Sequence, residues 1–281
     1  MTRASRTPAD LRINPRNLRF ATTMSGQRWW ARNDPIATAL YNAFSATFPE
    51  GEKLFIESVV RFRDQVAEPL KRQIVDFARQ EGNHTREHLA FNAHIAAAGY
   101  DMSRIEARML GRVTEARTRS ALAQLAVTAA LEHFTAILAH ASLKDSREFE
   151  GAPPEIARLW RWHAIEEIEH KAVAFDTLRA ATMDRPPVRR WMMRCMTMLL
   201  VTIGFTRSMT ANVADLLRQD GFEPAKLRGR ALRILFVDPG LLRRVLLHYL
   251  AYYRPGFHPW DIDDRDLIGE AEASIALPAA A

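Results

Sequence analysis

Cysteine is almost absent from this sequence of 281 residues, because Cys195 is its only representative. A single thiol cannot form an internal disulfide, so a disulfide-stapled secreted fold is excluded and a reducing compartment is expected. Glycine is also sparse, with 12 residues, and no convincing run of alternating strand residues occurs. The N-terminal stretch MTRASRTPADLRINPRNLRF is basic but lacks an apolar core. No secretory signal is therefore predicted, and a cytoplasmic protein is expected.

The apolar residues that are present recur at three- and four-residue steps, which predicts an all-α protein. Hydrophobic residues make up 48% of the chain and charged residues 26%, as in ordinary globular proteins. The net charge of +6 comes from arginines that are scattered along the chain, often beside acids. No helix-turn-helix or zinc-finger spacing accompanies them. A solvated, mildly basic surface is predicted rather than nucleic-acid binding.

The order of helical segments predicts a ferritin-like four-helix bundle of two hairpins joined by a crossover. A polar arm is expected over residues 1–35, the bundle over 36–184, and a helical extension packed on it over 185–281. The expected helices of the bundle cover residues 36–48, a stretch from Pro49 through GEKLFIESVVRFRDQV, about 69–98 before Gly99, 115–143, and about 154–183.

The C-terminal extension opens with the apolar stretch RRWMMRCMTMLLVTIGFTRSMTANVADLLRQDG. Its apolar run between Arg194 and Arg207 is shorter than the ~20 residues that a bilayer span requires. Three interpretations stay open for this helix: a buried core helix, a basic face lying on a membrane, or the wall of an apolar substrate channel. Cys195 is expected to be ordinary packing.

Four stretches carry a pattern of acids and histidines: PEGEKLF, RQEGNHTREH, LEHFTA and WHAIEEIEHKA. The second and fourth each contain Glu-x-x-His, which places a carboxylate and an imidazole on one helix face. The first and third each add one glutamate. One unit per helix in this order is the ligand set of dinuclear iron and manganese bundles. The candidate metal ligands are Glu52, Glu81, His84, Glu132, Glu167 and His170.

Antiparallel helices rise equally on both sides of their turn, which tests the two single glutamates. If the first turn centres near Ala67, the first Glu-x-x-His motif reflects to residues 50–53, where Glu52 lies. Glu57 is more than a turn too deep. If the second turn centres near Phe149, the second motif reflects to about residue 130, and Glu132 is the only acid on that stretch. Glu132 is the ligand expected to bridge two ions, with Glu81 and Glu167 as alternatives.

Charge supports the same set, because four carboxylates neutralise two divalent ions and imidazoles complete the coordination. Oxygen ligands mixed with nitrogen suit iron or manganese, and zinc less specifically. Burying these acids without cations would be very costly. The competing interpretation, charge patterning on solvated helix faces, accounts for one Glu-x-x-His but poorly for two at matching heights.

Three further groups share these faces and are candidate catalytic residues: Glu166, His163 and His88. Each is a candidate for an extra ligand, a partner of a ligand, or a proton relay. The alternative for each is a core or surface side chain with a purely structural role, whose hydrogen bonds are made within the protein. His133 points about a quarter turn away from Glu132 and is expected to be structural.

These stretches, with YYRPGFHPWDIDD near the C-terminus, resemble the bacterial family of predicted metal-dependent hydrolases from about Asn17 to about Asp264. The most specific elements are FPEGEKLF, QEGNHTREH, LEHFTA and WHAIEEIEHKAVAFD. The resemblance implies a ferritin-like fold and a dinuclear site with the six ligands above. More distantly, the metal constellation alone is similar to that of di-iron oxygenases, desaturases and N-oxygenases.

Three functions are compatible with this set. The first is a di-iron enzyme that activates dioxygen to oxidise a small or apolar substrate, with an electron-donor protein as partner. The second is metal-assisted hydrolysis. The third, iron storage or peroxide removal, fits poorly with a basic protein that carries a long C-terminal extension. The expected cofactor is two metal ions, iron first, with manganese or zinc as alternatives. A homodimer and a peripheral membrane contact stay open as partners.

Overall fold

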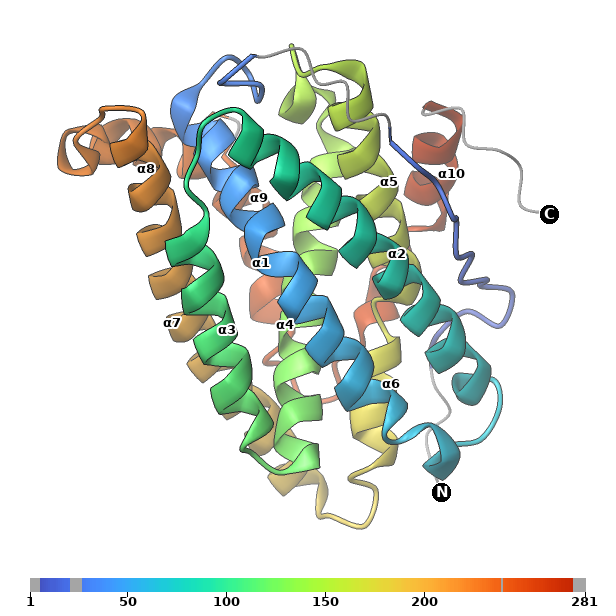
Figure 1. Ribbon diagram of the computed structural model, residues 1–281. Helices are drawn as coiled ribbons and strands as arrows, with labels where there is room; N and C mark the ends of the chain where they lie inside the picture. Colours follow the sequence, from blue (N-terminus) through green and yellow to red (C-terminus); the bar gives the residue numbers. More distant parts are fainter. Residues whose placement is uncertain (1–5, 21–26, 239, 275–281) are drawn as a thin grey trace.

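The computed structural model describes residues 6–20, 27–238 and 240–274, and every regular element within these ranges is a helix. The predicted all-α bundle is confirmed. Its core contains α1 (Pro35–Val60), α2 (Leu70–Ala97), α4 (Ala121–Lys144) and α5 (Pro154–His170). The most extensive packing joins α1 to α2 and α4 to α5, while α1 also contacts α4 and α2 contacts α5 (Figure 1). Four helices thus surround one interior.

The predicted helix boundary at Pro49 is wrong, because α1 continues through this residue. A proline inside a helix removes the hydrogen bond to the carbonyl four residues earlier, here that of Ser45. Asn92 on α2 replaces the missing donor, since its Nδ2 lies 3.1 Å from the Ser45 carbonyl. Its Oδ1 also accepts from the Ser45 hydroxyl at 2.7 Å. A contact from a neighbouring helix therefore keeps α1 continuous.

The predicted third helix starts too early at Glu115. That residue belongs instead to α3 (Ser103–Arg117), a helix that the sequence reading missed and that connects the two hairpins. Residues 118–120 separate α3 from α4. Ser120 caps α4, because its hydroxyl accepts a hydrogen bond from the Ala123 amide at 3.3 Å. Serine is a favoured N-cap residue because its side chain satisfies an otherwise unpaired amide.

The fourth predicted helix is interrupted after His170. It resumes as α6 (Val173–Ala180), short of the predicted end near residue 183. The interruption coincides with Lys171, which is buried. Its ammonium donates to Asp264 at 2.5 Å and to the Ile262 carbonyl at 2.9 Å. These partners come from the C-terminal extension, so helical periodicity gave no sign of the break.

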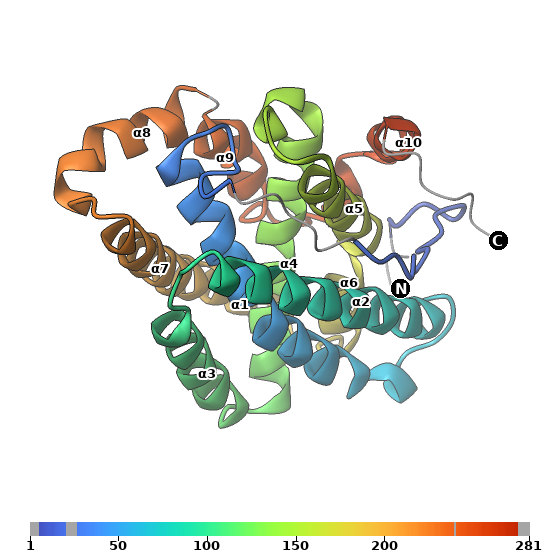
Figure 2. The ribbon, with the colours of Figure 1, turned by 45° about the horizontal axis from the view of Figure 1, so that its top comes forward.

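The C-terminal extension forms α7 (Pro187–Gln219), α8 (Arg228–Phe236), α9 (Leu241–Ala251) and α10 (Arg265–Ser274). α7 packs along α1 and α4, α9 packs on α4, and α10 packs on α5. In Figure 2, α3 and α7 lie on the side of the core opposite α10. The buried-core interpretation of α7 is therefore only half right. Met198 is fully buried, whereas Leu199, Leu200 and Ile203 are 45% to 65% exposed.

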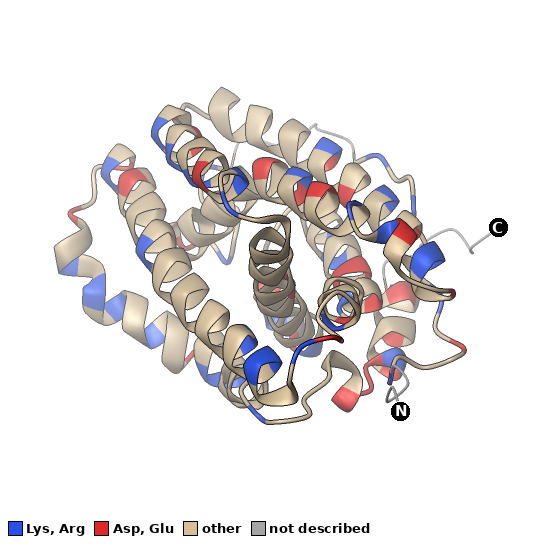
Figure 3. Cartoon of the chain, turned by 90° about the horizontal axis from the view of Figure 1, so that it is seen from below, with Lys and Arg blue, Asp and Glu red and all other residues tan. Residues whose placement is uncertain are grey.

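Among the described residues, α4 is the one helix whose length and hydropathy would suit a membrane span, and 56% of its most apolar window is buried. We attribute its apolar character to its central place in the bundle. Figure 3 shows basic and acidic positions mixed over part of the surface seen from below. The outer helices α7 and α8 carry mostly arginines, and α8 has no acid.

The N-terminal segment runs without regular structure across α2 and α5. The Phe20 amide donates to Glu87 at 3.1 Å, and the Arg16 amide donates to Glu166 at 2.8 Å. Arg16 is also paired with Glu169, 2.6 Å from its Nη2. The predicted arm thus contacts the core over its described part. Residues 1–5 and 21–26 of the arm, and the apolar tail at 275–281, lie outside the described residues.

We predict that Asn92→Ala lowers the free energy of unfolding by about 1–2 kcal/mol, because the buried Ser45 carbonyl loses the hydrogen bond from Asn92. The loss should shrink in a Pro49→Ala background, where residue 49 regains an amide that can donate to Ser45. Chemical denaturation of the four proteins of this double-mutant cycle measures the coupling. Equal losses in both backgrounds would contradict the proposed compensation.

Candidate metal centre

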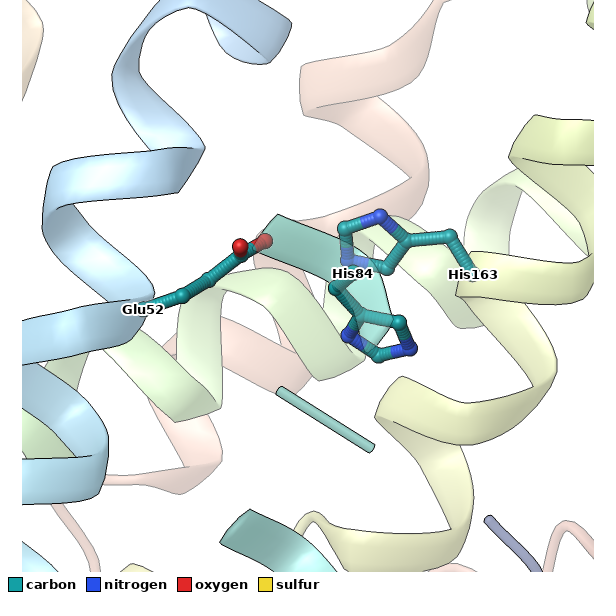
Figure 4. Close-up of side chains that lie close together, drawn as sticks. All are labelled: Glu52, His84 and His163. Carbon is teal, nitrogen blue, oxygen red and sulfur yellow. The ribbon is translucent and has the colours of Figure 1, made fainter. Parts of the chain in front are cut away.

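The six predicted ligands all lie on the inner faces of the core helices. They come from α1, α2, α4 and α5, and none is more than 4% exposed. Four of them form one cluster, with a ligand atom of each within 4.8 Å of the others: Glu81, Glu132, Glu167 and His170. A second cluster by the same measure contains Glu52, His84 and His163. Figure 4 shows these three side chains reaching toward one another from α1, α2 and α5.

Two glutamates lie between the clusters. His84 Nδ1 is 3.7 Å from Glu81 Oε1 and 3.5 Å from Glu167 Oε1. His170 Nε2 lies 3.2 Å and 3.5 Å from the same two oxygens. Of these two imidazoles, Glu132 is close only to His170, whose Nε2 lies 3.3 Å from its Oε2. The geometry therefore favours Glu81 and Glu167 as bridging ligands over the expected Glu132.

The inner atoms of this site lack hydrogen-bond partners among the described residues. The unpartnered buried atoms are Glu52 Oε1, both oxygens of Glu81 and of Glu132, Glu167 Oε2, His84 Nδ1 and His170 Nε2. A buried polar atom without a partner costs about 1–3 kcal/mol, and more if it is charged. Two cations in this interior would provide partners for all eight of these atoms. The residues present thus fit a dinuclear metal centre.

The outer nitrogens of both histidines are anchored, which fixes the direction of the inner ones. His170 Nδ1 lies 2.9 Å from Gln80 Oε1. The Gln80 amide donates from its nitrogen to Glu169 at 2.7 Å, so its oxygen can only accept here and His170 must carry its proton on Nδ1. The lone pair of Nε2 therefore faces the first cluster.

Glu166 has the same role for His84. Its Oε2 lies 3.0 Å from His84 Nε2, and its Oε1 accepts from the Trp162 indole at 3.1 Å. The Arg16 amide adds a third donor at 2.8 Å. These partners turn the carboxylate away from the cluster, so Glu166 positions His84 and is not placed as a ligand.

His163 is the residue whose place the sequence left most open. Its Nε2 is 2.9 Å from Glu167 Oε1, and its Nδ1 is 2.5 Å from His88 Nε2. His88 Nδ1 lies 2.9 Å from the Ser45 hydroxyl, which donates to Asn92 at 2.7 Å. Since Ser45 has one proton and gives it to Asn92, His88 must donate to Ser45, and His163 must donate to His88. This chain of hydrogen bonds places the proton of His163 on Nδ1 and leaves a lone pair on its Nε2. His163 is therefore suited to be a seventh ligand.

Burial keeps His163 and His88, the two imidazoles of this hydrogen-bond chain, neutral. It lowers the pKa of His163 to about 4, helped by the charge on His84, and it lowers the pKa of His88 well below its usual value. Burial raises the pKa of Glu132 to about 8. Burial and the charge of Glu81 raise that of Glu52. Burial also raises the pKa of Glu81, whereas the neighbouring histidines, His170 first, hold the pKa of Glu167 well below its usual value. Three of the four acids therefore tend to retain protons until cations replace them.

Two other residues of the core helices, an acid of α1 and a histidine of α4, lie outside the clusters. Glu57 is exposed and pairs with Arg117, whose Nη2 lies 2.7 Å away. His133 is buried, its Nε2 is 3.2 Å from the His248 carbonyl, and its ring packs on Tyr252. The sequence reading missed Gln80 and Thr85, the latter donating to Glu52 at 2.8 Å. Gln80 anchors a histidine of another helix, so no local spacing signals it.

A comparison with known proteins agrees with this donor set. A family model described as predicted metal-dependent hydrolase matches residues 14–263. The chain belongs to this family. No curated protein and no solved structure matches it. The matched range contains all the candidate ligands and the residues that anchor them.

We predict that Glu167→Ala removes most of the bound metal, because Glu167 adjoins both clusters. His163→Ala should lower the content from two ions toward one. Elemental analysis of protein purified with iron, manganese or zinc measures the stoichiometry. Glu57→Ala and His133→Ala are matched controls that should retain both ions. Two ions at full occupancy in the Glu167 variant would rule out this assignment.

We also predict that affinity for Mn²⁺ rises from pH 6 to pH 8. The Glu132 carboxyl, with its pKa raised to about 8 by burial, is protonated at pH 7, and binding must release that proton. Each released proton changes the affinity about tenfold per pH unit below the pKa. Competition with a fluorescent chelator at pH 6, 7 and 8 gives the dependence. An affinity independent of pH would contradict the prediction.

Proposed function

We propose that this chain is a di-iron enzyme that uses dioxygen to oxidise an apolar organic substrate. The observation that supports it is the contrast between the donor set and its surroundings. Glu52, His163 and Glu167 lie in the wall of a cavity of about 430 Å³ between α1, α3, α4 and α7. The remaining wall is mostly hydrocarbon, including Phe48 and Leu131. A substrate that fills this space would present C–H bonds to the metal centre.

The choice of iron follows from the ligand chemistry. Carboxylate oxygens dominate and imidazoles complete the set, which suits iron or manganese better than zinc, whose sites use more nitrogen and sulfur. The four carboxylates balance two divalent ions. When bound, two iron ions would supply the electrons for reducing dioxygen at open coordination positions.

The overall reaction needs an electron donor. One oxygen atom would enter a C–H bond of the substrate, and the other would leave as water, with two electrons and two protons consumed. We assign the electrons to a donor protein, the partner that this reaction requires.

The chain's own residues prepare the site in two ways. Gln80 and Glu166 hold His170 and His84 with fixed tautomers, so the inner nitrogens need no reorientation when ions bind. Phe44, Phe48 and Phe55 line the cavity side of α1 and keep water from the ligands. A dry, preorganised site favours oxidation of the bound substrate over side reactions with water.

The three candidate catalytic groups also act by orienting the ligands. Among the three candidate catalytic groups, Glu166 and His163 are engaged in holding the ligand set. His88 is one step further out, at 2.5 Å from His163 Nδ1 and 2.9 Å from the Ser45 hydroxyl. We propose His88 as a positioning residue that fixes the proton on His163 Nδ1.

The second candidate is hydrolysis, which the description of the family favours. Two ions could generate hydroxide and polarise a scissile group. The ligand anchors described above would serve that reaction equally, but most of the cavity wall is apolar, which suits a hydrocarbon substrate better.

The test is to load the full chain with ferrous iron without air and then admit oxygen. We expect rapid oxidation of both irons, followed as new near-ultraviolet absorption in a stopped-flow instrument. Glu81→Ala should abolish this reaction, and Glu57→Ala should leave it unchanged. An inert ferrous protein, together with zinc- or manganese-dependent cleavage of an ester or phosphate, would refute the proposal and support the hydrolase.

A further inference from the structure

The cavity beside the metal centre extends along the helices of the core. Its lining on α1 extends from Tyr41 to Phe55, and its lining on α4 from Val127 to Ser142. With a helical rise of 1.5 Å per residue, both walls are about 21 Å long. An extended chain advances roughly 1.2 Å per bond, because three backbone bonds span at most about 3.6 Å. The length therefore suits a linear chain of about 14 to 18 atoms.

The metal centre lies near one end of this cavity. Glu52 is three residues from the Phe55 end and eleven from the Tyr41 end, or about 5 Å and 16 Å by the same rise. The long arm toward Tyr41 passes aromatic and aliphatic side chains, among them Phe44, Leu138 and Ala139. A linear ligand in this arm would have one end close to the metal centre and the other end far from it, near Tyr41.

Arg112 lies at the end near the metal. Met109 on α3 contacts α1 beside Gly51, since a Cβ at position 51 would lie 3.3 Å from its Cε. Arg112 is one turn further along α3. Its guanidinium reaches α7, where a Cβ at Gly204 would lie only 3.0 Å from Nη1. The absence of a side chain at position 204 thus allows Arg112 to cross the gap between the two helices.

This arginine also lacks an anionic partner. Arg119, which lines the same end, is paired with Glu115 at 2.9 Å. Arg112 has neither a hydrogen bond nor an ion pair within the part of the chain that the structure describes. Arg112 is therefore the one arginine of the cavity wall that has no anionic partner among the described residues. A guanidinium recognises a carboxylate through two parallel hydrogen bonds.

We infer that the substrate is a long-chain carboxylic acid, bound with its carboxylate on Arg112 and its chain directed along the cavity toward Tyr41 and Ser142. The inference rests on the proposed function, because it names the molecule that the metal centre would oxidise. It places the carbons closest to the carboxylate beside Glu52 and the methyl end about 16 Å away.

Binding is measured with the full chain loaded with Zn²⁺, which holds the site together without consuming the ligand. Octanoate, dodecanoate and hexadecanoate compete with a neutral, polarity-sensitive dye, alongside dodecanol, dodecyl phosphate and dodecyltrimethylammonium. We expect hexadecanoate to bind most tightly of the acids, and dodecanoate to bind more tightly than the other dodecyl compounds.

Two variants separate the two ends of the site. Arg112→Gln should raise Kd for dodecanoate roughly three- to tenfold, the range for an exposed charged contact, without changing Kd for dodecanol. Arg104→Gln, an exposed arginine on the same helix away from the cavity, is the matched control. Ala139→Phe should close the far arm, so that hexadecanoate binding weakens severalfold while octanoate binding is retained.

Three results would overturn the inference. The first is equal binding of dodecanoate and dodecanol with no effect of Arg112→Gln. The second is dodecyl phosphate binding more than tenfold more tightly than dodecanoate. The third is insensitivity to both variants, which would place the chains on the exposed apolar face of α7. Because zinc cannot reduce dioxygen, these outcomes are independent of the oxygen test: inert iron with intact acid binding refutes the proposed function alone, and reactive iron without acid binding refutes this inference alone.

Discussion

The structure depends on burying four carboxylates in one interior. Glu52, Glu81, Glu132 and Glu167 come from four different helices, and each is at least 96% buried. Acids this close together repel one another, and desolvation penalises each charge, so the arrangement is favourable only with cations between them. Every core helix contributes one carboxylate, and a shift of one residue in any helix would turn its ligand about 100° away. Bringing these four carboxylates to one place thus fixes the register of the core helices.

The same constraint explains why a segment without regular structure belongs to the core. The Asn14 amide donates to Glu169 at 3.1 Å, and the Asn14 carbonyl accepts from Gln80 at 3.3 Å. Gln80 in turn orients His170. Arg16 similarly holds Glu166, which orients His84. The N-terminal segment therefore acts on both ligating histidines through one intermediate each, and the family match begins at this point of the chain, at residue 14.

The sequence predicted the parts of the site that local geometry determines. Glu-x-x-His spacing places two ligands on one face, and reflection across a turn selected Glu52 and Glu132, which the structure brings to the same interior. It could not assign His163, because its role depends on a hydrogen-bond chain through His88 and Ser45 on two other helices. The sequence could not predict that α1 continues through Pro49 for the same reason, because the compensating donor, Asn92, lies on α2. Contacts between helices decide what spacing along one helix leaves open.

The two clusters differ in a way that bears on where a substrate can react. The first combines three glutamates with one histidine, and the second combines one glutamate with two histidines. Of the first cluster only Glu167 lies in the cavity wall, whereas Glu52 and His163 of the second cluster both do. The carboxylate-rich side is thus mostly enclosed by the helices, and the nitrogen-rich side borders the cavity. A cation held on that side would have fewer anionic ligands than one held on the enclosed side, and it would lie next to a molecule bound in the cavity. If the proposed oxidation takes place, the asymmetry of the protein ligands would give the two positions different tasks, with charge balance at the enclosed one and reaction at the one beside the cavity.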